Sequence, residues 1–222
     1  MRSVYYSVMS KVAVLLLAFA AAWTSAATFL RAQQPPLKTA SLESHEGLTV
    51  SVRPWTDAAQ YKEKFHKNSP LAAGIVALEV AFRNDSDDSI RINLSRIRLN
   101  VDLSDDNRQG LATLTPDEVA DGVLHPVSKD PTTSRSKLPI PIGKQPNGHD
   151  KRWTELQKAA SDAGLPGSIV APHKTLEGLL YFDLQGQLDL LNAAHFYVPE
   201  AMALESHRPL MYFDVDLSKR NR

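Results

Sequence analysis

The stretch FRNDSDDSIRINLSRIRLNVDL, residues 82–103, carries two runs of alternating apolar side chains behind an acidic turn. Such a two-residue period is typical of half-buried strands. The two runs have opposite parity: the first holds Ile90, Ile92 and Leu94, and the second holds Ile97, Leu99, Val101 and Leu103. The change of parity at Ser95-Arg96 indicates a β-bulge or a strand that passes from one sheet to another, as happens in β-sandwiches.

Other segments repeat this period. The clearest are GLTVSV (47–52), GIVALEVAFRN (74–84), TLEGLLYFDL (175–184) and PLMYFDVDL (209–217). QLDLLNAAHFYV (187–198) fits a sixth strand or a short helix, and the pattern leaves both open. We therefore expect a mainly β protein, an antiparallel sandwich with a single domain at 47–218.

The segment 104–168 differs in character, and we expect it to be a helical, Pro-rich insertion between strands. TPDEVADGVL (115–124) has Thr115 as N-cap and Glu118 three residues later, which is the pattern of a capping box. DKRWTELQKAASDAGLPG (150–167) has apolar residues at helical spacing and ends in Gly and Pro. Between these two helices, residues 125–152 hold five prolines and too few apolar side chains for a core of their own.

The N-terminus predicts export. Arg2 and Lys11 precede an apolar run and then small residues, so we expect a signal peptide at 1–27. The alternative is an uncleaved membrane anchor through residues 12–30, a run without charges that is long enough to span a bilayer. Residues 28–46 are predicted to be a polar tether. Either way the domain is expected outside the cytoplasm, in the periplasm or the extracellular space, free or anchored to the membrane.

Composition narrows the classes of function. The chain of 222 residues has no cysteine, which excludes disulfides, thiolate metal sites and cysteine nucleophiles. Lys and Arg equal Asp and Glu at 25 each, so bulk charge does not indicate a nucleic-acid partner.

Two strand segments resemble those of a known family. VALEVAFRNDSDDSIRINL (76–94) is an apolar strand that ends in Asn, followed by a polar turn and a second strand. APHKTLEGLLYFDL (171–184) has Pro172, Gly178 and Phe182 at the spacing of a P-x-x-x-x-x-G-x-x-x-F segment. The chain thus resembles the telokin-like, immunoglobulin-like exported bacterial domains of unknown function, in which a glycine usually stands where this chain has His173. The resemblance implies an immunoglobulin-like antiparallel sandwich that binds or spaces and has no catalytic residues.

No motif predicts catalysis or a metal site. The seven histidines do not form H-x-x-x-H, H-x-H or H-E-x-x-H. The loops NDSDDS (84–89) and DLSDDNRQG (102–110) are acidic but lack the EF-hand spacing, so solvated turns are favoured over calcium sites. G-x-S-x-G and S-x-x-K are absent. The sequence predicts a protein that is not an enzyme, with no cofactor.

We therefore expect an exported binding or accessory module of the cell envelope, with an envelope or extracellular protein as its partner. Its working surface is expected on the segment 104–168, because loops on a rigid scaffold commonly carry function. The candidate binding residues there are Arg135, Lys137, Arg152 and Trp153. One alternative is an exported protease inhibitor that presents the Pro-rich loop. Another is a calcium-dependent envelope module, for which EDTA would lower the melting temperature.

Overall fold

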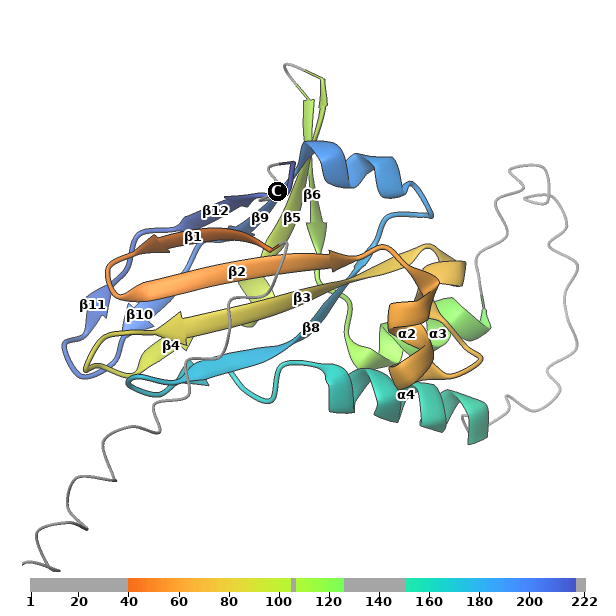
Figure 1. The fold of residues 1–222 in the computed structure, drawn as a ribbon, viewed down its shortest axis with the longest axis horizontal. Helices are drawn as coiled ribbons and strands as arrows, with labels where there is room; N and C mark the ends of the chain where they lie inside the picture. The colour runs from red at the N-terminus through yellow and green to blue at the C-terminus, as the bar shows by residue number, and fades with distance from the viewer. Residues whose placement is uncertain (1–39, 105–106, 126–150, 219–222) are drawn as a thin grey trace, which may run out of the picture. The chain divides into compact units, whose positions relative to one another are not determined.

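A computed structural model describes residues 40–104, 107–125 and 151–218. In these residues the strands form three four-stranded sheets, and all of their pairings are antiparallel. The predicted mainly β, antiparallel fold is therefore confirmed (Figure 1). The predicted signal peptide and membrane anchor lie outside the described residues, and within those residues no helix has the length and apolarity needed to cross a bilayer.

The first sheet has the order β1-β2-β3-β8, from β1 (Ser41–His45), β2 (Leu48–Trp55), β3 (Ile75–Asn84) and β8 (Thr175–Asp183). The second sheet has the order β11-β10-β4-β7, from β11 (Arg208–Pro209), β10 (Ala201–Ala203), β4 (Ile90–Ile92) and β7 (Ile169–Val170). The third sheet has the order β12-β9-β5-β6, from β12 (Phe213–Asp216), β9 (Ala194–Val198), β5 (Arg98–Ser104) and β6 (Asn107–Ala112). The helices are α2 (Ala58–Phe65), α3 (Pro116–Leu124) and α4 (Lys151–Ala163), with 3₁₀ turns η1 (Pro70–Ala73), η2 (Leu94–Arg96) and η3 (Leu188–Ala193).

The change of parity in the stretch 82–103 is a change of sheet. β4 lies in the second sheet and β5 lies in the third, and the single 3₁₀ turn η2 connects them. Both runs bury the side chains that their parity predicts: Ile90, Ile92, Ile97, Leu99 and Val101 are each no more than 1% exposed. The last residue of each run departs from this: Leu94 on η2 is half-buried, and Leu103 near the end of β5 is 47% exposed.

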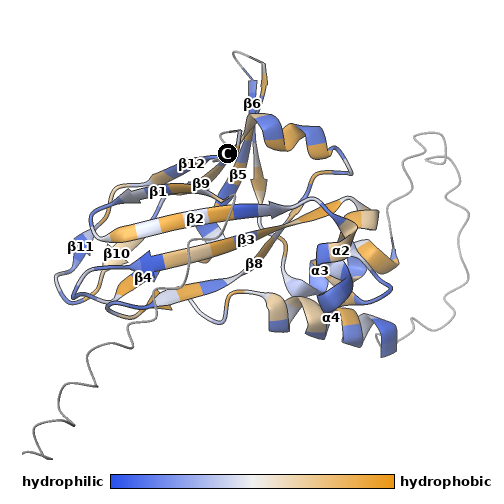
Figure 2. Cartoon of the chain, in the orientation of Figure 1, coloured by the Kyte–Doolittle hydropathy of each residue, from blue (hydrophilic) through white to orange (hydrophobic). Residues whose placement is uncertain are grey.

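One apolar core lies between the sheets. It takes the inward side chains of β2, β3 and β8 from the first sheet and those of β4, β5, β9, β10 and β12 from the other two. Phe82, Phe182, Phe196 and Phe213 are fully buried in it. Figure 2 shows the corresponding hydrophobic bands along the strands of the first sheet.

A second core covers the opposite face of the first sheet at one end (Figure 1). There Trp55, Ala77 and Tyr181 from the strands pack against Tyr61 and Phe65 of α2 and against side chains of α3 and α4. β3 is therefore buried on both faces, which explains why its sequence is almost continuously apolar.

The helices begin and end at residues whose capping role can be compared with the sequence-based expectation. In α3, Thr115 accepts a hydrogen bond from the Glu118 N–H and the Glu118 carboxylate accepts one from the Thr115 N–H, which confirms the predicted capping box. α4 ends before Gly164, as the sequence predicts. α2 was not predicted, although Asp57 and Gln60 form a second capping box that is legible in the sequence.

Three boundaries differ from the sequence-based expectation. The tether predicted at 28–46 includes a strand, because β1 pairs with β2 and Ala40 is buried, so the domain begins before Gly47. The segment 104–168, predicted to be helical and Pro-rich, begins instead with β6, which extends the third sheet. For the segment 187–198 the sequence left a strand and a short helix open, and the structure has both: the 3₁₀ turn η3 is followed directly by the strand β9. β1 and β6 lie at the edges of their sheets and carry few apolar side chains, so they lack the two-residue period by which the other strands were predicted.

Tyr61 joins the second core to the first sheet. Its hydroxyl donates to the Trp55 carbonyl at 2.9 Å and accepts from the Ala77 N–H at 2.7 Å, and the side chain is fully buried. Burial raises the pKa of Tyr61 to about 12, opposed by the hydrogen bond from Ala77. One hydroxyl thus satisfies two strand groups at the site where α2 docks.

Replacement of Tyr61 by Phe should lower the free energy of unfolding by about 1–3 kcal/mol, because the Ala77 N–H and the Trp55 carbonyl would be buried without a partner. Urea unfolding followed by circular dichroism measures this. Tyr212→Phe is the matched control, since Tyr212 is 51% exposed. Equal effects of the two variants would contradict the role given to the Tyr61 hydroxyl.

Candidate functional site

The change of sheet creates a pocket. It has a volume of about 500 Å³ and lies where η2 leaves the second sheet, beside β4, β10 and the end of β11. We call it the η2 pocket. Its lining residues are Arg91, Ile92, Asn93, Leu94, Ser95, Ser168, Pro199, Glu200, Ala201, Met202, Pro209 and Leu210.

The floor of the η2 pocket is formed by main chain that is already hydrogen-bonded within the protein. Ile92, Ala201 and Leu210 are at most 7% exposed, and their side chains belong to the main core. The Ile92 N–H donates to the Ser168 carbonyl at 2.8 Å and the Leu210 N–H donates to the Ala201 carbonyl at 2.9 Å. The main chain under the pocket therefore already has its hydrogen-bond partners.

The rim is polar on one side. Glu200 accepts from the Asn93 amide at 2.7 Å and lies 3.6 Å from the Arg96 guanidinium. The Asn93 N–H also donates to the Glu200 carbonyl at 3.0 Å. These contacts fix η2 against the turn before β10, so the wall of the pocket is held by several bonds.

Arg91 stands on the outer face of the second sheet. Its cross-strand neighbours are Met202 on one side and Ile169 on the other, and Met202 is itself paired with Pro209. Its guanidinium donates to the Met202 Sδ at 3.8 Å. A thioether sulfur is only a weak acceptor, so this contact leaves most of the donor capacity of Arg91 unused.

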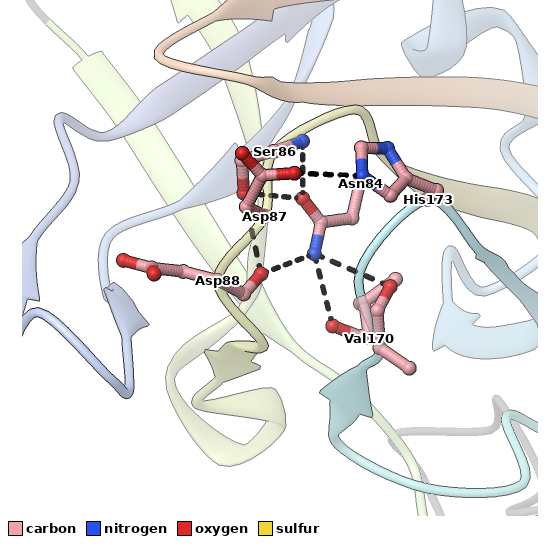
Figure 3. A network of polar contacts seen from close by, with 7 residues as sticks. Asn84, Ser86, Asp87, Asp88, Val170 and His173 are labelled. Atoms are coloured by element: carbon pink, nitrogen blue, oxygen red, sulfur yellow. Dashed lines mark hydrogen bonds and ion pairs between the residues drawn. The ribbon is translucent and has the colours of Figure 1, made fainter.

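A second polar site lies at the turn between β3 and β4 (Figure 3). The fully buried Asn84 side chain donates to the carbonyls of Asp88 at 2.7 Å, Val170 at 3.1 Å and Ala171 at 3.3 Å. Its Oδ1 accepts from both the N–H and the hydroxyl of Ser86. Asn84 thereby ties the acidic turn to the β7–β8 connection.

The carboxylates of this acidic turn do not converge. Asp85 pairs with Arg83 at 3.0 Å, Asp87 with His173 at 2.9 Å, and Asp88 accepts from Ser206 at 2.5 Å. Within the described residues no group of three or more His, Asp or Glu is arranged to hold a metal ion. The turn has the contacts of a structural element, and the calcium hypothesis gains no support from them.

A third polar cluster lies on the outer face of the third sheet. His195 places Nδ1 at 3.2 Å from Asp214 and Nε2 at 3.7 Å from Asp102, which in turn pairs with Arg108 at 2.6 Å. The hydrogen bond from Arg108 holds the pKa of Asp102 below its ordinary value, against the effect of burial. The two imidazole nitrogens face different carboxylates, so the cluster links side chains of four strands, and the Asp102–Arg108 contact in it is an ion pair.

Two of the four predicted binding residues, Arg152 and Trp153, lie in the described part of the chain. Arg135 and Lys137 lie outside the described residues, as does nearly all of the Pro-rich loop. Arg152 is exposed at the start of α4. Trp153 packs against the helical core and donates from Nε1 to the Asp121 carboxylate at 2.7 Å, so it joins α4 to α3.

The sequence did not identify the η2 pocket. In the alternating pattern Arg91 has the exposed parity, and a charge on the outer face of a sheet needs no ligand. The pocket forms when residues 90–92 pair with residues 201–203, a contact over more than a hundred positions. The one local signal was the change of parity itself, which marks the η2 turn.

Comparison with known proteins assigns no family. No family model and no curated protein matches the chain. Among solved structures, a functionally unknown protein from Listeria monocytogenes EGD-e is similar at 16% sequence identity and a TM-score of 0.33, over 72% of this chain and 70% of that chain. At that TM-score the similarity establishes neither a fold nor a function.

We expect Asn84→Asp to lower the free energy of unfolding by about 3 kcal/mol, because a buried carboxylate would face the three carbonyl oxygens that the amide now serves. Chemical denaturation at neutral pH measures the change. Asn192→Asp is the control, since Asn192 is exposed on η3. A change of similar size in both variants would show that Asn84 does not hold the turn.

Acid should destabilise the fold through three surface carboxylates. The pKa of Glu46 is lowered by the hydrogen bond from the Met211 N–H, that of Asp102 by Arg108, and that of Glu205 by the Ser89 hydroxyl. A carboxyl whose pKa is lower in the folded state contributes stability above its unfolded pKa, and this contribution is lost as the pH falls through the folded pKa.

The melting temperature should therefore fall steadily as the pH drops below about 4.5, the ordinary value for glutamate. In Glu46→Gln this fall should be shallower, whereas Glu63→Gln, on the exposed side of α2, should follow the wild type. Parallel slopes for all three proteins between pH 5 and pH 2 (a range set by the ordinary carboxyl pKa values) would contradict the linkage to Glu46.

Proposed function

We propose that this protein is an exported, non-catalytic binding module of the cell envelope, built on an immunoglobulin-like antiparallel sandwich, with the η2 pocket as its ligand site. The observation that carries the proposal is the pocket itself. It lies on paired strands, has half-buried apolar walls at Leu94, Pro199 and Met202, and has polar groups on its rim. Pockets of 300–1,000 Å³ with this mixture are typical of small-molecule sites.

Support for the sandwich comes from the main core. Inward side chains of the first sheet pack there against those of the second and third sheets. Two antiparallel layers that share one core are the defining feature of a sandwich. The helices on the outer face of the first sheet are an addition to that scheme.

Two backbone positions support the resemblance to the telokin-like domains. His173 has φ +55°, a left-handed conformation that explains why a glycine usually occupies this position. At Gly178 a Cβ would lie 2.6 Å from the backbone of Gly164, so any side chain there would clash. Phe182 is fully buried in the main core, as expected for the last position of the motif.

Export is supported by the sequence of residues 1–27, with charges followed by an apolar run and small residues. The absence of cysteine means that the domain is held by its cores without disulfides. The protease-inhibitor alternative depends on the Pro-rich loop, and residues 126–150 of that loop lie outside the described residues.

Hydrogen exchange tests the proposal. We expect an envelope fraction of the producing cell to slow amide exchange in residues 91–96 and 199–202, which border the η2 pocket, and to leave α2 unchanged. A cytosolic fraction at equal protein concentration should have no effect.

A matched pair of variants localises the effect. Met202→Arg places a bulky cation inside the η2 pocket and should abolish the protection. Met211→Arg makes the same change at a side chain that is 61% exposed and outside the pocket, so its protection should equal that of the wild type. If the envelope fraction slows exchange only elsewhere on the domain, the η2 pocket is not the working site. The same conclusion follows if exchange in residues 91–96 and 199–202 does not change.

A further inference from the structure

We propose that the η2 pocket binds an aliphatic carboxylate, an unbranched acyl chain whose carboxylate is held by Arg91 and Ser168. The inference rests on the proposed binding function and names the class of ligand. It follows from which polar groups of the pocket remain available, from the chemistry of its walls and from the state of its backbone.

The first argument is the isolation of Arg91. Most arginines of the described residues have a carboxylate partner, namely Arg53, Arg83, Arg96, Arg108 and Arg208. Arg98 is bonded to the main-chain carbonyls of Ser95 and Ile97. The Arg91 guanidinium contacts only the Met202 sulfur. Within the described residues, this cationic side chain of the pocket therefore has no carboxylate partner.

The second argument is that the free polar groups of the rim can donate hydrogen bonds. Asn93, Ser95 and Glu200 are bonded to one another: the Ser95 hydroxyl donates to the Asn93 Oδ1 at 2.8 Å, and the Asn93 amide donates to Glu200. The Arg91 guanidinium and the Ser168 hydroxyl have no such partner in the described part of the chain. Ser168 directly precedes Ile169, the strand neighbour of Arg91, and both Arg91 and Ser168 line the pocket.

A carboxylate suits these two donors. A guanidinium presents paired N–H groups that match the two oxygens of a carboxylate, and a hydroxyl can supply a further hydrogen bond. Glu200 does not oppose such a ligand strongly, because Arg96 lies against its carboxylate. A cationic ligand would have to share the Glu200 carboxylate with Asn93 and Arg96, which already contact both of its oxygens.

The third argument concerns the walls. The apolar surface beside Arg91 is aliphatic and thioether, from Leu94, Pro199, Met202 and Pro209, and none of the described residues that line the pocket is aromatic. Methionine adapts its shape to irregular apolar groups. Such walls suit a saturated hydrocarbon chain.

The backbone distinguishes an acyl chain from a peptide. The main-chain N–H groups of Ile92, Asn93 and Leu210 already donate to carbonyls of the protein. A peptide bound here would bury amide groups without partners, which is costly, whereas an acyl chain has no amide groups to satisfy. The geometry therefore favours a fatty acyl carboxylate over a peptide C-terminus.

Titration calorimetry with sodium octanoate tests the proposal on the full chain. Octanoate should bind, and affinity should rise about fourfold for each added methylene from hexanoate upward until the pocket is filled. Octylammonium, which has the same tail and the opposite charge, should bind at least tenfold more weakly.

Two arginine variants provide the decisive comparison. Arg91→Gln should weaken octanoate binding by a factor of ten or more, because it removes the charge-assisted hydrogen bonds. Arg83→Gln removes the same charge from an exposed position outside the pocket and should bind like the wild type. Any uptake by residues 12–30 is identical in these proteins and cancels in the comparison, and thermal melts verify that both variants fold.

Each other outcome overturns the inference. Equal binding of octanoate and octylammonium would mean that the tail alone is recognised. Equal affinity of wild type and Arg91→Gln would mean that the anion is held elsewhere. Tighter binding of N-acetyl-alanyl-leucine than of octanoate would replace the acyl chain by a peptide C-terminus. Failure of octanoate together with envelope-dependent protection of the η2 pocket would leave the binding function intact and refute only this class of ligand.

Discussion

Strand β3 has its two faces in two different apolar cores, and the rest of the fold is arranged around that constraint. Val76, Leu78, Val80 and Phe82 point into the core shared by the three sheets, while Ile75 and Ala77 point into the core under the helices. A strand buried on both faces must have its hydrogen bonds satisfied on both edges, and β2 and β8 supply them along its length. Because Ile75 and Ala77 point away from the main core, the helices are needed to bury that face of the first sheet.

In contrast to β3, which is ten residues long, the strands of the second sheet have only two or three residues each. Short strands leave room at their ends, and the chain uses that room to turn through η2 from one sheet to the next. The η2 pocket is the space beside this turn. The pocket is held by the strands on its floor and by the Asn93–Glu200 contacts on its wall.

Sequence patterns predicted the strands whose inward side chains build the main core. The period of two located β2, β3, β8 and the two halves of the stretch 82–103, because each alternation reports a side chain in the main core. Local chemistry also located α3 through Thr115 and Glu118. β1 and β6 were missed because edge strands carry few apolar residues, and α2 was missed although Asp57 and Gln60 supply a cap. The η2 pocket could not be read from the sequence, since Arg91 and Met202 meet only through strand pairing over more than a hundred residues.

The Asn84 network has a consequence for the order of folding. Asn84 lies at the end of β3, but two of its carbonyl partners lie 86 and 87 positions later in the chain. During synthesis from the N-terminus, the first hairpins of the domain are complete long before these partners exist, and the outer edge of β3 stays open until β8 follows. The chain must therefore remain incompletely folded until β7 and β8 have been made, and the long loop closure then makes folding slow relative to that of proteins with local contacts. A nascent chain in this state exposes a long apolar strand edge, which is the kind of surface that chaperones cover.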